Sequence, residues 1–144
     1  MQQHAGISVP IPLDADSLWR EIGGFGAVAK WHPMLAEVDC EGEGPGARRT
    51  ARAKDGSRQV ERLQKIDPRK HFYRYSIEQS PLPVRNYVAE LRVDDNGNGS
   101  STVTWQADFD VPDKHRAETV RMVESFLKAG VESLKKRHAG ANGG

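Results

Sequence analysis

The sequence lacks the features of several common protein classes. Its single cysteine, Cys40, cannot form an internal disulfide, which fits a reducing compartment. No apolar stretch approaches the roughly 20 residues that span a bilayer. The N-terminus also lacks the basic and then apolar pattern of a secretion signal. These absences predict a cytoplasmic protein without a transmembrane segment.

Charge and histidine spacing exclude further classes. The 21 Lys and Arg residues nearly balance the 20 Asp and Glu residues, so no overall field attracts nucleic acid. The basic outer positions Arg48, Arg52, Lys54, Arg58 and Arg62 have no interleaved aromatic residues for base stacking, and a solvated face is expected. The five histidines are too scattered for a zinc site. We expect no nucleic-acid partner, no metal and no cofactor.

The pattern along the chain predicts one domain with a sheet and a long helix. Alternating apolar residues predict a strand at 7–13, and its two prolines favour an edge position. Two short helices follow, the first between Asp14 as N-cap and Gly23, the second over 26–30. Turn residues then separate six further strands, at 35–40, 47–54, 58–66, 72–78, 85–93 and 101–109.

A helix is expected from Asp113, as N-cap, to about His138, because apolar residues recur at helical spacing, at Val120, Val123, Leu127, Val131 and Leu134. This order of elements predicts an α+β fold in which seven antiparallel strands form a curved sheet around the helix. The domain would span residues 1–138, followed by a disordered tail at 139–144.

Alternation along the third strand predicts which side chains face the helix. Ala47, Arg49, Ala51 and Ala53 share one face, and alanines fill a concave surface poorly. Either a bulky neighbour or a ligand must occupy the space. The same reading turns the following groups inward on later strands: Glu61 and Leu63; Tyr73, Tyr75 and Ile77; Tyr87, Ala89, Leu91 and Val93; Val103, Trp105, Ala107 and Phe109.

One of these positions, and one on the helix, need an explanation beyond core packing. A carboxylate at Glu61 is costly in an apolar lining unless it meets a partner such as Arg49, His32 or water. A structural salt bridge and a ligand contact are equally good explanations. On the helix, Gly130 lies on the same face as Met122 and Phe126. Because glycine destabilises the interior of a helix, its presence here predicts either the close approach of a neighbouring group or open space beside it.

Short motifs in a fixed order resemble a known family. They are Trp19…Ile22…Phe25…Trp31-His32-Pro33, the GPGARR run from Gly44, Asp55-Gly56, Glu61-Arg62-Leu63…Asp67, Tyr75-Ser76-Ile77, Pro83…Tyr87 and Trp105…Phe109. Over about residues 5–136 the chain is similar to the polyketide cyclase/dehydrase-like branch of the START and birch-pollen-allergen (SRPBCC) superfamily, including bacterial relatives of plant abscisic-acid receptors. The resemblance implies a helix-grip fold. The superfamily includes lipid and hormone binders, polyketide aromatases and cyclases, and quinone-binding proteins.

The resemblance also implies site residues. Glu61 and Tyr87 match polar pocket positions of the hormone receptors, and wall positions are matched by Ala51, Ala53, Tyr75, Ile77, Trp105, Phe109, Met122, Phe126 and Gly130. His32 stands where those receptors carry a lysine that meets an acidic ligand, so a different ligand is implied. The proline-rich segment 80–84 replaces their basic latch. It forms either a rim of the cavity or a rigid turn.

Two functions are compatible with these residues. The first is binding or transport of a small, mostly hydrophobic molecule such as a lipid, polyketide or quinone, by a monomer or weak homodimer. The alternative is a cyclase, aromatase or dehydratase in which His32, Glu61 and Tyr87 carry protons or donate hydrogen bonds. The predicted ligand-binding residues are His32, Arg49, Ala51, Ala53, Glu61, Tyr75, Ile77, Tyr87, Ala89, Trp105, Phe109, Met122, Phe126 and Gly130.

Overall fold

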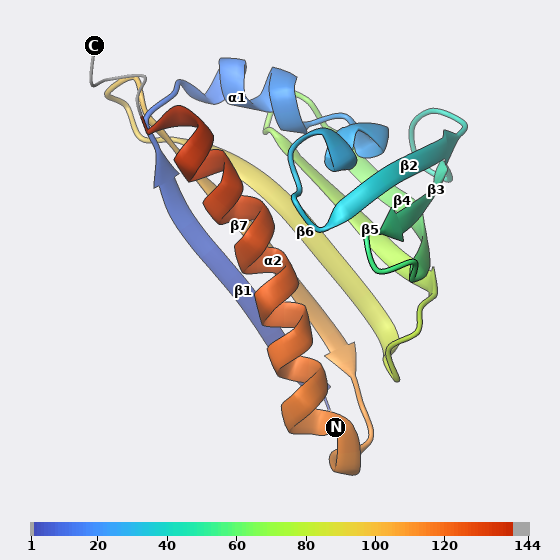
Figure 1. The fold of residues 1–144 in the computed structure, drawn as a ribbon. Helices are drawn as coiled ribbons and strands as arrows, with labels where there is room; N and C mark the ends of the chain where they lie inside the picture. Colours follow the sequence, from blue (N-terminus) through green and yellow to red (C-terminus); the bar gives the residue numbers. More distant parts are fainter. Residues whose placement is uncertain (1, 140–144) are drawn as a thin grey trace.

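The computed structural model describes residues 2–139 and contains one antiparallel sheet with a long helix on its concave side (Figure 1). The seven strands lie in the order β1-β7-β6-β5-β4-β3-β2. Their bounds are β1 Gln2–Ile11, β2 Leu35–Glu41, β3 Arg48–Ala53, β4 Arg58–Asp67, β5 Phe72–Gln79, β6 Arg85–Asp95 and β7 Ser101–Asp110. The predicted helix-grip fold is confirmed.

The first strand, β1, lies at one edge of the sheet, as its prolines predict, because an edge strand tolerates a residue without a backbone N–H. It begins at Gln2, five residues before the predicted start at Ile7. The early residues are polar or small, but β1 pairs with β7 along its whole length, from Gln2 with Asp110 to Ile11 with Ser101. Pairing therefore extends the strand beyond the apolar alternation.

Two short helices connect β1 to β2. In α1 (Ala15–Ile22), the Asp14 carboxylate accepts a hydrogen bond from the Ser17 backbone N–H over 3.0 Å, as predicted for the N-cap. The helix ends at Gly23, whose N–H donates to the Trp19 carbonyl. The second helix, η1 (Phe25–Lys30), is a 3-10 helix that packs beside β2.

The long helix α2 (Arg116–His138) contacts β1 and β7 (Figure 1). Its buried side includes Val123, Leu127, Val131 and Leu134 from the predicted apolar stripe. The expected N-cap, Asp113, is wrong: residues 113–115 form a 3-10 turn, η2 (Asp113–His115), and the α-helix starts at Arg116. A 3-10 turn is a common way for a helix to begin.

A continuous buried core joins the sheet, α1, η1 and α2. Within residues 2–139, no helix combines the length and apolarity that crossing a membrane requires. The tail predicted at 139–144 lies outside the described residues except for Ala139.

Candidate functional site

A cavity of about 160 Å³ lies between the sheet and α2. The β3 strand lines it with Ala51 and Ala53, β7 with Trp105, and α2 with Val123 and Phe126. Both alanine side chains are single methyl groups, and the aromatic residues Trp105 and Phe126 line the same cavity. Of the two explanations for small side chains on this face, the structure shows open space.

Exposed lining residues mark where the cavity opens to solvent, here termed the mouth. They are Met34, Asp55, Arg58, Pro81 and Met122. Among the described residues, Met34 and Met122 are the large hydrophobic side chains left exposed, at 44% and 50%. The position of Pro81 shows that the proline-rich segment 80–84 borders the cavity as a rim. Flexible thioethers give this mouth an adaptable apolar surface.

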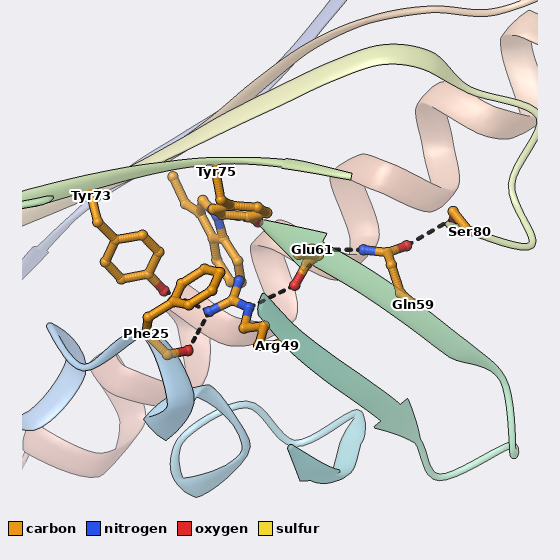
Figure 2. Close-up of polar contacts among 8 residues, drawn as sticks. Phe25, Arg49, Gln59, Glu61, Tyr73, Tyr75 and Ser80 are labelled. Carbon is orange, nitrogen blue, oxygen red and sulfur yellow. Dashed lines mark hydrogen bonds and ion pairs between the residues drawn. The ribbon is translucent and has the colours of Figure 1, made fainter. Parts of the chain in front are cut away.

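Arg49 and Glu61 form a buried ion pair in the cavity wall (Figure 2). They are cross-strand partners on β3 and β4, and Arg49 Nε donates to Glu61 Oε1 over 2.7 Å. Arg49 is 1% exposed and Glu61 4%. The carboxylate predicted to need a partner therefore has one, and that partner is Arg49.

Further contacts hold the Arg49 guanidinium in place. Its Nη1 donates to the Phe25 carbonyl over 2.7 Å and to the Tyr73 hydroxyl over 3.1 Å (Figure 2). The guanidinium carbon lies 4.2 Å from the ring centroid of Phe25 and 4.6 Å from that of Tyr75. Burial is the largest single influence and acts to lower the pKa of Arg49, but Glu61, Tyr73 and Tyr75 together outweigh it and raise the pKa above its ordinary value. Arg49 is therefore a fixed cation.

A chain of hydrogen bonds leads from this ion pair to the rim. Gln59 Nε2 donates to Glu61 Oε2 over 2.9 Å, and Ser80 Oγ donates to Gln59 Oε1 over 2.9 Å (Figure 2). The backbone N–H of Leu82 donates to Ser80 Oγ over 3.1 Å. Both oxygens of Glu61 are thus occupied by protein donors. The chain connects the buried charge to a segment that borders the mouth.

Tyr87 is a polar residue of the wall whose hydroxyl has no protein partner within residues 2–139. It is 6% exposed, and its ring stacks on Phe109 with 5.4 Å between centroids. In the described part of the chain, the fully enclosed side-chain N or O atom without a partner is Trp31 Nε1. The Tyr87 oxygen therefore borders open space. Burial, and then the charge of Glu61, raise the pKa of Tyr87, so the hydroxyl stays protonated.

A β-bulge positions Tyr87. The pairing of β6 with β7 shifts register between Arg85 and Val88, and Asn86 has a φ of 53°. The Asn86 amide donates to Asp110 Oδ2 over 2.8 Å, which holds this uncommon backbone conformation. Bulges often turn a neighbouring side chain toward a site. Here Tyr87, which lies within the bulge, lines the cavity.

His32 packs into the core and does not line the cavity. Its Nε2 lies 2.7 Å from the Phe126 carbonyl, and its Nδ1 accepts from the Met34 N–H over 3.1 Å. A carbonyl only accepts and an amide N–H only donates, so these contacts define a neutral ring with the proton on Nε2. Burial lowers the pKa of His32 from 6.5 to about 4. This histidine ties the turn after η1 to α2.

Gly130 makes room for that contact. A Cβ at this position would lie 2.7 Å from His32 Cδ2 and 2.8 Å from Trp105 Cζ3. Of the two explanations given for the glycine, close approach is the one observed. Gly130 is thus a packing position between α2 and the aromatic core.

The predicted ligand-binding residues fall into two groups. The cavity is lined by Arg49, Ala51, Ala53, Glu61, Ile77, Tyr87, Trp105, Met122 and Phe126. The lining excludes His32, Tyr75, Ala89, Phe109 and Gly130, which are all buried elsewhere in the core. Tyr75 accepts a hydrogen bond from Trp105 Nε1 over 3.2 Å. The second group therefore supports the wall from behind.

Several lining residues were not identified from the sequence. Gln59 was missed although it shares the face of Glu61 two residues later, so the alternation of that strand could have located it. Val28, Leu35 and Val123 read as ordinary core residues and carry no distinguishing signal. Arg58, expected on the outer basic face, lines the cavity mouth instead.

The outer face of the sheet carries ion pairs. Arg48 and Arg62 both pair with Glu78, and Arg52 pairs with Glu37. The sequence prediction of a solvated face agrees with these exposed pairs. In the part of the chain that the structure describes, no group of three or more His, Cys, Asp or Glu residues could hold a metal ion.

The curved sheet gripping α2, with a cavity between them, defines a helix-grip protein. Residues 2–139 match the family described as polyketide cyclase / dehydrase and lipid transport, and the chain belongs to that family. No curated protein matches the sequence significantly.

Solved structures share this fold. An uncharacterized protein from Bacillus thuringiensis has 25% identity and a TM-score of 0.88, with 95% of this chain and 99% of that chain covered. A Thermobifida fusca protein has 29% identity and a TM-score of 0.82, with 96% and 93% covered. The Zhui aromatase/cyclase from a Streptomyces species has 16% identity and a TM-score of 0.78, with 99% and 96% covered. At that identity, the likeness to the aromatase/cyclase shows the fold alone.

Proposed function

We propose that this protein binds a small, mostly apolar molecule in the cavity between the sheet and α2. The observation that carries the proposal is the cavity of about 160 Å³, in which Ala51 and Ala53 leave space opposite Trp105 and Phe126. Cores are normally packed without voids of this size, because empty space forfeits dispersion contacts. A ligand recovers those contacts and buries its own apolar surface.

The family description covers both lipid transport and cyclase or dehydrase chemistry. The arrangement of side chains supports binding over the enzymatic alternative. His32, the expected proton carrier, has both ring nitrogens bonded to protein and lies outside the lining. Both Glu61 oxygens accept hydrogen bonds from protein groups. Tyr87 alone of the three proposed catalytic groups offers a free polar atom to the cavity.

Native mass spectrometry of freshly purified protein tests the proposal. We expect an added mass from a co-purified small molecule, and the substitution Ala51→Trp should remove it because the indole fills the cavity. Far-ultraviolet circular dichroism and thermal unfolding would verify that the variant is folded. Thr104→Val, on the exposed face of β7, provides a control that should retain the added mass. An added mass that persists in folded Ala51→Trp would contradict the cavity as binding site.

A further inference from the structure

The volume of the cavity limits the part of a ligand that can be buried in it. An engineered apolar cavity of about 150 Å³ holds benzene, whereas pockets for drug-sized molecules span about 300–1,000 Å³. At about 160 Å³, this cavity has room for about one six-membered ring. Ile77, Leu82 and Tyr87 also line a second, open hollow near the end of β5, and so separate it from the cavity. A molecule with fused rings would have to displace these three side chains or protrude through the mouth.

The charges in the wall favour an uncharged ligand. The Arg49 cation is compensated by Glu61, and both Glu61 oxygens are taken by protein donors. A carboxylate in the cavity would lose its hydration and meet Glu61, while an ammonium group would meet Arg49 without a free counter-charge. The remaining charged lining residues, Asp55 and Arg58, are exposed at the mouth. A charged group would remain in water there.

One polar contact is available inside. The Tyr87 hydroxyl is the unpartnered polar group on a deeply buried wall residue, and it stays protonated. A phenol can donate to a carbonyl or hydroxyl oxygen. Leaving the hydroxyl without a partner when an entirely apolar ligand excludes water would cost binding free energy. The geometry therefore favours one oxygen on an otherwise apolar molecule.

On the basis of the proposed function, we infer that the cavity takes an uncharged single-ring molecule carrying one carbonyl or hydroxyl oxygen that pairs with the Tyr87 hydroxyl. The inference assigns Tyr87 as the residue that orients the ligand. Arg49 and Glu61 supply an electrically neutral wall, and Ala51 and Ala53 set the size.

Four probes separate size, charge and hydrogen bonding. Acetophenone is the predicted class, α-methylstyrene replaces its carbonyl oxygen with a methylene group, benzoate is an anion of nearly the same shape, and 1-acetonaphthone adds a fused ring. Chemical-shift titration of the full chain measures each dissociation constant. We expect α-methylstyrene to bind roughly five- to tenfold more weakly than acetophenone, as one hydrogen bond implies. Benzoate and 1-acetonaphthone should each bind at least about tenfold more weakly.

Tyrosine variants test the orienting role. In Tyr87→Phe, acetophenone and α-methylstyrene should bind with about equal affinity, because the hydroxyl that distinguishes them is gone. Tyr75→Phe is the matched control: its hydroxyl pairs with Trp105 and lies outside the lining, so the preference for acetophenone should persist. If Tyr87 had only a structural role, Tyr87→Phe would lower the affinity for acetophenone and for α-methylstyrene by the same factor. A preference that survives in Tyr87→Phe would therefore overturn the assignment.

The remaining outcomes distinguish this inference from the proposed function. Ala51→Trp tests the cavity, and Ala53→Phe, at a half-buried position, serves if the first variant does not fold. If benzoate or 1-acetonaphthone bound as tightly as acetophenone, and these variants abolished that binding, the inferred ligand class would be overturned. The cavity would still be the binding site. Failure of acetophenone and α-methylstyrene to bind would also overturn the class. Probe binding that neither cavity variant changes would overturn the proposed function itself.

Discussion

The buried ion pair predicts a large and specific loss of stability when one partner is removed. In Glu61→Leu, the Arg49 guanidinium would remain 1% exposed, between the rings of Phe25 and Tyr75, with only neutral acceptors. Removing one member of a buried pair costs about 3–5 kcal/mol. The Gln59 amide would also lose its acceptor, which adds about 1 kcal/mol. We expect Glu61→Leu to lower the free energy of unfolding by about 4–6 kcal/mol.

A double-mutant cycle tests the cause of that loss. Arg49→Met alone leaves a buried carboxylate, whereas Arg49→Met combined with Glu61→Leu removes both charges. The double variant should be more stable than Glu61→Leu, with a coupling energy of at least about 2 kcal/mol. Urea unfolding at pH 7 measures each free energy, and Arg48→Met, at an exposed pair with Glu78, should change the midpoint little. Additive effects of the two single substitutions would refute the reasoning.

Two further predictions concern the contact between His32 and α2. The pKa of His32 is lowered to about 4, so below pH 6.5 the unfolded chain takes up a proton that the folded protein resists. Stability should fall by up to roughly 3 kcal/mol as pH drops from 6.5 to 4, and urea unfolding of His32→Gln should lack this component. Gly130→Ala should lower the thermal midpoint despite the better helix propensity of alanine, because its Cβ would collide with His32 and Trp105. An unchanged or higher midpoint would contradict this close approach.

Much of the fold follows from local patterns in the sequence. Apolar alternation and turn residues locate the strands, and the Asp14 cap and Gly23 define the first helix, because these signals depend on nearby residues. Errors occur at element ends. The start of β1 at Gln2 depends on pairing with β7, about a hundred residues away, and the start of α2 depends on a 3-10 turn that Asp113 enters.

The site was predicted less completely, for a physical reason. Alternation identifies the face on which Arg49, Ala51 and Glu61 lie, and the cost of a buried charge correctly indicates a partner for Glu61. Alternation along a strand does not indicate whether an inward-facing side chain meets open space or another side chain. Phe109 and Tyr75 face inward but pack behind the wall. His32 packs away from the cavity because Gly130, distant in sequence, leaves room for its ring against α2.

The alternation on β3 has a consequence for how this protein can diverge. Arg49, Ala51 and Ala53 occupy one face of the strand at two-residue steps. Arg49 is hydrogen-bonded to three neighbouring elements, and the two alanines set the volume of the cavity. Substitution at residue 51 or 53 alters the space for a ligand without removing a polar contact that holds the wall. Ligand size can therefore change during evolution through single substitutions, while the framework around the buried ion pair is kept.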